Sequence, residues 1–223
     1  MSANRHVVAT GPRPGHARAV RALLALPLLL LGCWPEPDLT GAPALERPPL
    51  PLPSLLVPAS DEAAGNELRA VFVDERDPAR VELTFVWRDE DHPAFDLGYD
   101  LLRWFRWHRV ADVETSAIRR DPATGAPLAL VLPGTFAADQ AWEARFPRHH
   151  SREVAWDALP RGPDGRPRVW VATWNHLFGL APPPRAPGVS VEWREWRDLP
   201  LRRGSREECQ ALYEATWRAA MRR

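Results

Sequence analysis

The stretch DVETSAIRRDPATGAPLALVL, residues 112–132, decides the fold of this chain. Its two halves, residues 112–119 and 126–132, are rich in apolar and β-branched side chains, and the segment DPATG separates them. Proline suits the second position of a tight turn and glycine accepts a positive φ, so this segment has the composition of a turn. The stretch therefore predicts a β-hairpin.

Other parts of the chain carry strand patterns as well. Apolar and polar side chains alternate in residues 80–87, and residues 67–74, rich in Val and Phe, precede them across an Asp77-Pro78 turn. A period of two is typical of a half-buried strand, so these runs predict a second hairpin. Residues 168–173 and the alternation over 189–193 predict further strands. Five or six short strands favour a mainly β fold, here a single β-sandwich-like domain.

A helix is predicted at the C-terminal end of the chain. Ser205 and Glu208 have the spacing of a capping box, which satisfies two backbone N–H groups at the start of a helix. Several of the residues that follow recur at helical spacing and would share one face of the helix: Cys209, Leu212, Tyr213, Thr216 and Ala220. Residues 97–108 fit either a helix or a strand, and the pattern does not separate the two.

The first 33 residues have the order of a secretion signal. A stretch with four arginines leads into an apolar run, residues 22–31, which Gly32 and Cys33 follow. A membrane-spanning helix needs about 20 apolar residues, and this run is about half that length and contains Pro27. Its length is that of a signal-peptide core. The end of the run, Leu30-Leu31-Gly32-Cys33, resembles the lipobox of bacterial lipoproteins.

That resemblance implies a lipoprotein signal peptide over residues 1–32 and a lipid-modified Cys33 at the new N-terminus. Several acyl chains, palmitate among them, would then hold the protein on a membrane of the bacterial cell envelope, facing the periplasm or the exterior. A plain signal peptide and an uncleaved anchor remain alternatives. Residues 33–60 contain eight prolines, which favour an extended conformation, and predict a lipidated stalk that precedes a globular domain over residues 61–223.

Charge and cysteine content narrow the function classes. The formal net charge is +0, which gives no reason to expect a nucleic-acid partner. Cys33 and Cys209 are the two cysteines, so no disulfide framework is expected, and Cys209 is predicted to pack as a small apolar residue. If Cys33 carries no lipid, a bridge between the two stays open. The motifs of phosphate loops, zinc proteases and nucleophile elbows are absent.

A divalent-cation site is the main chemical candidate. On a strand, Asp112 and Glu114 point to the same face, and His108 lies just upstream. Carboxylate oxygens suit Ca²⁺ and Mg²⁺, and an imidazole nitrogen extends the choice to Zn²⁺. The alternative is a solvated acidic face on an edge strand.

Two segments resemble those of necrosis-inducing-protein-like domains and of related vacuolar-protein-sorting-associated domains. Residues 108–114, HRVADVE, are similar to the His-x-x-Asp-Trp-Glu motif of that family, and residues 167–176, PRVWVATWNH, are similar to a later strand that ends in a histidine. The resemblance implies a β-sandwich with a divalent cation, and it carries a metal-binding role to Asp112, Glu114, His108 and His176. Some members of that family bind membrane sphingolipids.

The 11 tryptophans suggest a second type of site. Their ordinary role is packing in the core, but exposed indoles also line clefts that bind glycans or lipid headgroups. Trp174, at the end of a predicted strand, and His149 are the candidate ligand-binding residues.

These features favour a membrane-anchored envelope protein whose β-rich domain is a binding module with a divalent-metal site. The alternatives are a metal-dependent hydrolase, in which His176 or His149 moves protons, and an envelope scaffold without a small-molecule site. Because no nucleophile is evident, a non-enzymatic module is the favoured interpretation.

Overall fold

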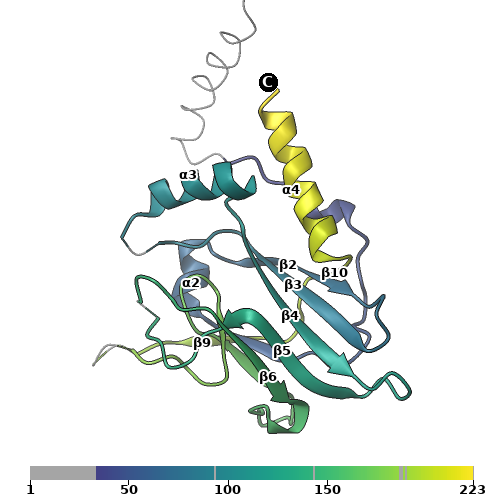
Figure 1. Ribbon diagram of the computed structural model, residues 1–223. Helices are drawn as coiled ribbons and strands as arrows, with labels where there is room; N and C mark the ends of the chain where they lie inside the picture. Colours follow the sequence, from purple (N-terminus) through teal and green to yellow (C-terminus); the bar gives the residue numbers. More distant parts are fainter. Residues whose placement is uncertain (1–33, 93, 143, 186–187, 189, 223) are drawn as a thin grey trace, which may run out of the picture.

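The computed structural model describes residues 34–92, 94–142, 144–185, 188 and 190–222, so the expected signal peptide and Cys33 lie outside the described residues. Figure 1 shows the arrangement of the helices and strands. In chain order these are η1 (Leu39–Gly41), β1 (Ser54–Pro58), α2 (Ala59–Ala64), β2 (Leu68–Asp74), β3 (Arg80–Trp87), α3 (Asp96–Trp107), β4 (Asp112–Arg120), β5 (Pro127–Phe136), β6 (His150–Ala155), η2 (Trp156–Ala158), β7 (Arg168–Val171), β8 (Phe178–Gly179), β9 (Trp193–Trp196), β10 (Leu201–Arg203) and α4 (Arg206–Ala220).

The strands within the described residues form one mixed sheet of ten strands. Its order is β10-β2-β3-β4-β5-β8-β7-β1-β9, and β6 pairs with β5 as well. Hairpins join β2 to β3 and β4 to β5, and β3 pairs antiparallel with β4 although α3 lies between them in the chain. The pairs β1 with β7, β2 with β10 and β5 with β8 are parallel. The expected mainly β fold with a C-terminal helix is therefore confirmed.

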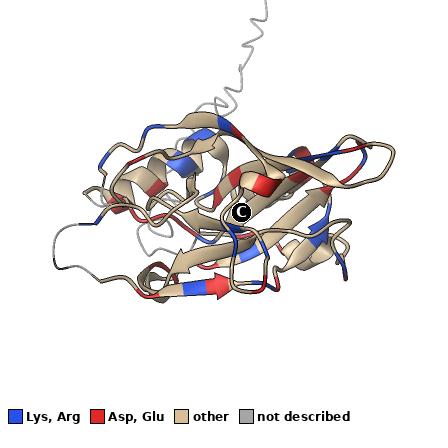
Figure 2. Ribbon diagram, turned by 90° about the horizontal axis from the view of Figure 1, so that it is seen from below, with Lys and Arg blue, Asp and Glu red and all other residues tan. Residues whose placement is uncertain are grey.

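Charged residues of both signs are interspersed over the domain. Figure 2 shows positively and negatively charged positions side by side along the ribbon. This distribution fits the balanced composition of the chain. Within the described residues, no helix has both the length and the apolar character that crossing a bilayer requires.

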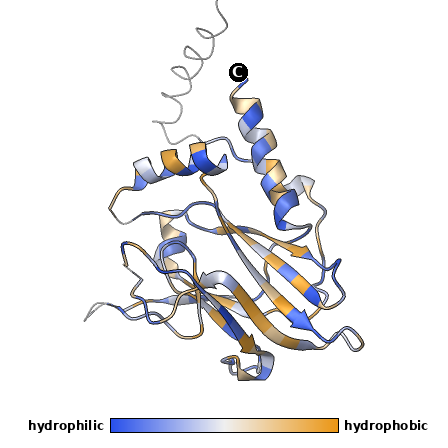
Figure 3. Ribbon diagram, viewed as in Figure 1, coloured by the Kyte–Doolittle hydropathy of each residue, from blue (hydrophilic) through white to orange (hydrophobic). Residues whose placement is uncertain are grey.

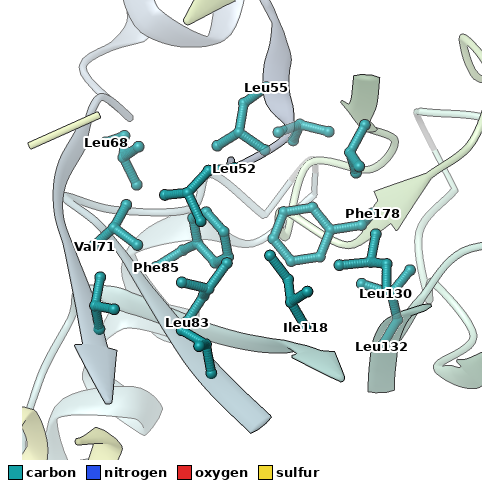
Figure 4. Close-up of a cluster of buried hydrophobic side chains, with 14 of the residues drawn as sticks. Leu52, Leu55, Leu68, Val71, Leu83, Phe85, Ile118, Leu130, Leu132 and Phe178 are labelled. Carbon is teal, nitrogen blue, oxygen red and sulfur yellow. The ribbon is translucent and has the colours of Figure 1, made fainter. Parts of the chain in front are cut away.

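The sheet curls so strongly that its two halves face each other across the core. Phe85 of β3 contacts Phe178 of β8 with ring centroids 5.0 Å apart, although β4 and β5 stand between these strands in the sheet. Hydrophobic and hydrophilic residues alternate along the strands (Figure 3), and the inward set forms a continuous apolar core (Figure 4). Curling thus gives one sheet the packing of a sandwich.

Helix α4 covers part of the outer face of the sheet. Its capping box is present, because the Ser205 hydroxyl accepts from the Glu208 N–H and the Glu208 carboxylate accepts from the Ser205 N–H. Cys209 and Tyr213 pack against Val113 and Phe72 on the outward side of β4 and β2. The expected role of Cys209 as a buried apolar residue is confirmed.

The remaining sequence-based predictions differ in their outcome. Residues 97–108, left open between helix and strand, are helical up to Trp107 as part of α3, and His108 is the C-cap. The strand expected over 189–193 begins only at Trp193, and Val189 lies outside the described residues. The two expected hairpins are present, with boundaries shifted by a few residues.

The prediction that residues 33–60 form an extended stalk is wrong, because part of this segment belongs to the sheet and the core. Ser54–Pro58 forms β1, which pairs with β7 on one side and β9 on the other. Leu50, Leu52 and Leu55 are buried in the core. The prolines concealed this strand, but they stand before it and at its last residue, where a missing N–H is tolerated. The globular domain therefore begins before Asp61.

We expect Leu55→Ala to lower the free energy of unfolding by about 2–5 kcal/mol, because it removes a buried side chain and leaves a cavity. Leu128→Ala is the control, since Leu128 is 41% exposed, and its effect should stay within about 0.5 kcal/mol. Urea denaturation of both variants measures the difference. Equally small effects would mean that β1 does not pack in the core.

Candidate metal centre

Three buried side chains, those of Glu90, Asp112 and His176, converge at one end of the sheet. One ligand atom from each lies within 4.8 Å of the other two. Glu90 follows the end of β3, Asp112 opens β4, and His176 lies between β7 and β8. Because β3 and β4 are antiparallel, the end of β3 lies beside the start of β4.

The register of β3 and β4 turns Asp112 toward the core. Asp112 stands directly opposite Trp87, and opposite residues of an antiparallel pair share a face of the sheet. Trp87 is fully buried and its indole stacks on the His176 ring, with centroids 4.3 Å apart and the planes 5° from parallel. The Trp87 indole and the Asp112 carboxylate therefore both contact the His176 imidazole.

His176 is held between two carboxylates. Its Nδ1 lies 3.0 Å from Asp112 Oδ2, and its Nε2 lies 3.2 Å from Asp61 Oδ2. The backbone of His176 has a φ of 54°, a left-handed conformation that is rare outside glycine. The Thr173 hydroxyl accepts from the Leu177 N–H, and the Thr173 carbonyl accepts from the His176 N–H, which fixes this turn.

The charges around His176 favour its protonated form. Burial disfavours an imidazolium, but the charge of Asp61 and the hydrogen bonds to Asp112 and Asp61 outweigh burial and raise the pKa of His176 to about 10. At neutral pH both ring nitrogens therefore carry protons, and each donates to an aspartate. In return, the His176 hydrogen bond and charge outweigh the effect of burial on Asp112 and lower the pKa of that carboxyl.

Two further carboxyl groups resist ionisation in this environment. Burial, and then the charge of Asp112, raise the pKa of Glu90 to about 8. Glu114 lies on the same face as Asp112, opposite Phe85, and burial together with the charges of Asp112 and Glu90 raises its pKa well above the usual range. Ionisation of all these carboxyl groups at once would therefore leave an excess of negative charge at this end of the sheet.

Helix α3 supplies a buried cation and a phenol to the centre. Arg103, 1% exposed, places Nε 3.2 Å from Glu90 Oε1 and Nη1 3.2 Å from Asp89 Oδ1. The Tyr99 hydroxyl donates to Glu90 Oε1 at 3.0 Å. Even so, the pKa of Glu90 stays raised, so these partners do not fully offset its burial and the charge of Asp112.

The structure brings together some of the residues predicted from sequence. Asp112 and His176 are in contact, and Glu114 lies on the same strand face as Asp112. His108 is not in this group, because it ends α3 and its ring lies against Trp217, with centroids 4.1 Å apart.

The predicted ligand-binding pair does not form an open aromatic platform. Trp174 is 6% exposed, its Nε1–H donates to the Ala144 carbonyl at 2.8 Å, and its ring packs edge-on against His92 and Tyr99. His149 is exposed and its Nδ1 lies 2.9 Å from the Gly134 carbonyl. Trp174 therefore acts as a packing residue.

Sequence reasoning missed Asp61, Glu90 and Arg103. One signal was present, since the acidic run of residues 89–91 directly follows a strand whose end must lie beside Asp112. Asp61 had no such signal, because its partner His176 is 115 residues away.

Comparison of the chain with models of protein families, with curated proteins and with solved structures gave no match. The likeness to necrosis-inducing-protein-like domains therefore rests on the two quoted segments and stays a prediction.

The stability of the metal-free protein should fall with rising pH. The folded-state pKa of His176 is raised above the unfolded value of about 6.5, so its contribution is fully present below that pH and is lost as the pH rises through about 10. Urea midpoints measured in chelator between about pH 9, where a carboxyl with the pKa of Glu90 is mostly ionised, and about pH 10 report this effect.

His176→Gln should lose this pH dependence and cost about 3–5 kcal/mol near neutral pH, because two buried carboxylates lose their cation. His150→Gln is the matched control, because His150 is exposed on β6. If His176→Gln keeps the wild-type slope above about pH 9, the imidazolium assignment is wrong.

Proposed function

We propose that this protein is a lipid-anchored component of the bacterial cell envelope whose β-rich domain binds a divalent cation beside Glu90, Asp112 and His176. The observation that carries the metal-binding part is the close approach of these three ligand groups, within 4.8 Å, in a buried environment. Acidic groups on a surface repel each other weakly, but buried ones need a counter-charge.

A bound cation would offset the charge of these carboxylates when all of them are ionised. Each buried carboxylate without a full counter-charge costs free energy, and protonation, which raised pKa values indicate, is one way to avoid that cost. A divalent ion is another, and it lets Glu90 and Glu114 ionise at neutral pH. The buried Arg103 and His176 reduce the repulsion in the metal-free state.

The hydrogen bonds of His176 favour oxygen ligation. Both ring nitrogens donate to aspartates, so the imidazole becomes a ligand only after it loses a proton and one aspartate partner. The carboxylates of Glu90 and Asp112 need no such change. Oxygen donors suit Ca²⁺ and Mg²⁺, whereas Zn²⁺ would recruit His176 and release a proton.

The burial of the centre supports a binding or structural role over hydrolysis. Metal-assisted hydrolysis needs an open coordination position that a substrate can reach. His176 and Glu90 are 0% and 4% exposed. A cation held there would link the segment that follows β3, the start of β4 and the segment that joins β7 to β8.

The anchor rests on the N-terminal sequence. A basic stretch, an apolar run of signal-peptide length and the Leu-Leu-Gly-Cys end at Cys33 support processing as a lipoprotein. Trp34 packs against Trp104 of α3, so the domain follows Cys33 without a long spacer.

Divalent cations should raise the melting temperature of metal-depleted protein. An ion that binds only the folded state adds about 2.7 kcal/mol at a hundredfold excess over its Kd, which corresponds to several degrees for a domain of this size. Thermal unfolding in chelator and then with Ca²⁺, Mg²⁺ or Zn²⁺ measures the shift.

Glu90→Gln should lose this shift and keep its stability in chelator, because it removes an ionisable ligand but leaves a partner for Tyr99 and Arg103. Glu153→Gln is the matched control, since Glu153 forms an exposed ion pair with Arg119, and it should retain the full shift. Loss of the shift in both variants, or in neither, would argue against the site.

Cys33→Ser should abolish lipid attachment, because only the thiol accepts the diacylglyceryl group. Cells that express the wild type should incorporate labelled palmitate into the protein, and cells that express the variant should not. Equal labelling of the two proteins would end the lipoprotein proposal.

A further inference from the structure

Helix α3 has its polarity reversed relative to an ordinary surface helix. It buries Asp100 and Arg103, together with Trp104, on the side that faces the domain. Its outward side carries Leu102 and Phe105, and Leu97 in its first turn is exposed as well. A helix on a soluble domain normally points its apolar stripe inward.

The buried centre explains the reversal. Arg103 must face inward to reach Glu90 and Asp89, and the i+3 geometry of a helix turns Asp100 the same way. Because polar side chains occupy the inner face, the apolar residues of the helix are left outside. Figure 3 shows hydrophobic positions on the α3 ribbon, above the sheet.

The exposed apolar side chains gather at one place. Within the described residues, the large hydrophobic side chains that are exposed are Phe95 (65%), Leu97 (47%), Leu102 (56%), Phe105 (58%), Trp107 (42%), Leu128 (41%) and Phe146 (75%). All but Leu128 and Phe146 belong to residues 95–107. Phe146 approaches the start of α3, since its ring lies 6.4 Å from that of His92. Such a concentration of exposed apolar residues marks an interaction surface.

This surface lies beside the start of the described chain. The Trp34 ring packs against Trp104 of α3 with centroids 5.5 Å apart, and Trp217 from the end of α4 joins the same cluster. Figure 1 shows α3 and the C-terminal end of α4 at the same end of the molecule. Cys33 is the residue next to Trp34, so a lipid on Cys33 would enter the bilayer beside α3.

Basic residues accompany the apolar surface. Arg106 is exposed on α3, and Arg218 and Arg222 are exposed at the end of α4, next to Trp217. Arginine side chains near a membrane are attracted to the phosphates of anionic lipids, by about 1 kcal/mol each. An apolar helix face with neighbouring arginines has the composition of a helix that lies in the membrane interface.

We propose that the outward face of α3, formed by Leu102 and Phe105, docks onto the surface of an anionic lipid bilayer. The inference rests on the proposed lipid anchor at Cys33, which would keep α3 at a high effective concentration next to the bilayer. Signal-peptide cleavage would remove residues 22–31, the apolar segment of this chain that could otherwise cover α3.

A fluorescent probe on α3 tests this docking. The full-length protein with Phe105→Cys is purified from membranes, labelled with an environment-sensitive dye and reconstituted into phosphatidylcholine vesicles with and without phosphatidylglycerol. Cys209 is fully buried and a lipidated Cys33 has no free thiol, so the new cysteine takes the dye. Leu128→Cys, an exposed site on β5, is the matched control, and unchanged melting temperatures confirm that both variants fold.

On vesicles, the dye at position 105 should emit at shorter wavelength, and the shift should be larger when phosphatidylglycerol is present. Nitroxide-labelled lipids should lower its intensity. The dye at position 128 should show neither change. If the protein floats with the vesicles but the dye at position 105 emits as it does in water, docking is overturned and the lipid anchor is retained. A short-wavelength emission that lipid quenchers do not affect means that protein covers α3, which also overturns docking. Protein that does not float has no anchor, and both proposals then fail.

Discussion

The rest of the structure depends on the placement of His176 between Asp112 and Asp61. This contact joins three parts of the chain that are far apart in sequence: helix α2, the first residue of β4 and the turn before β8. Isolated charges are costly to bury, and a cation between two carboxylates lowers that cost for all three groups. Trp87 covers one face of the ring and keeps water from competing for the hydrogen bonds.

The same charges determine how helix α3 is oriented. Glu90 and Asp89 need a partner inside the domain, and Arg103 of α3 is that partner. The helix must therefore turn its polar side inward and its apolar side outward. The proposed cation site and the proposed membrane-docking face thus have one cause, the buried acidic side chains. If Glu90 and Asp89 needed no cationic partner, α3 would have no reason to turn Arg103 inward and its apolar side outward.

The sequence predicted the local elements well and the long-range ones poorly. The hairpin around residues 121–125 and the capping box at Ser205 depend on neighbouring residues, so their patterns were sufficient. Strand β1 was missed because its prolines resemble a linker, and its burial depends on β7, more than 100 residues away. Asp112 and His176 were found as candidates, but Asp61 and Arg103 have no local signal, because only the tertiary fold brings them to the centre.

The central claim is that the carboxylates around His176 hold a divalent cation, and anomalous diffraction from crystals grown with Mn²⁺ tests it most directly. Mn²⁺ accepts the same oxygen ligands as Ca²⁺ and Mg²⁺ and scatters anomalously. The account predicts an anomalous peak about 2.0–2.6 Å from carboxylate oxygens of both Glu90 and Asp112. A map with no peak at this centre, in protein whose His176 still contacts both aspartates, would contradict it.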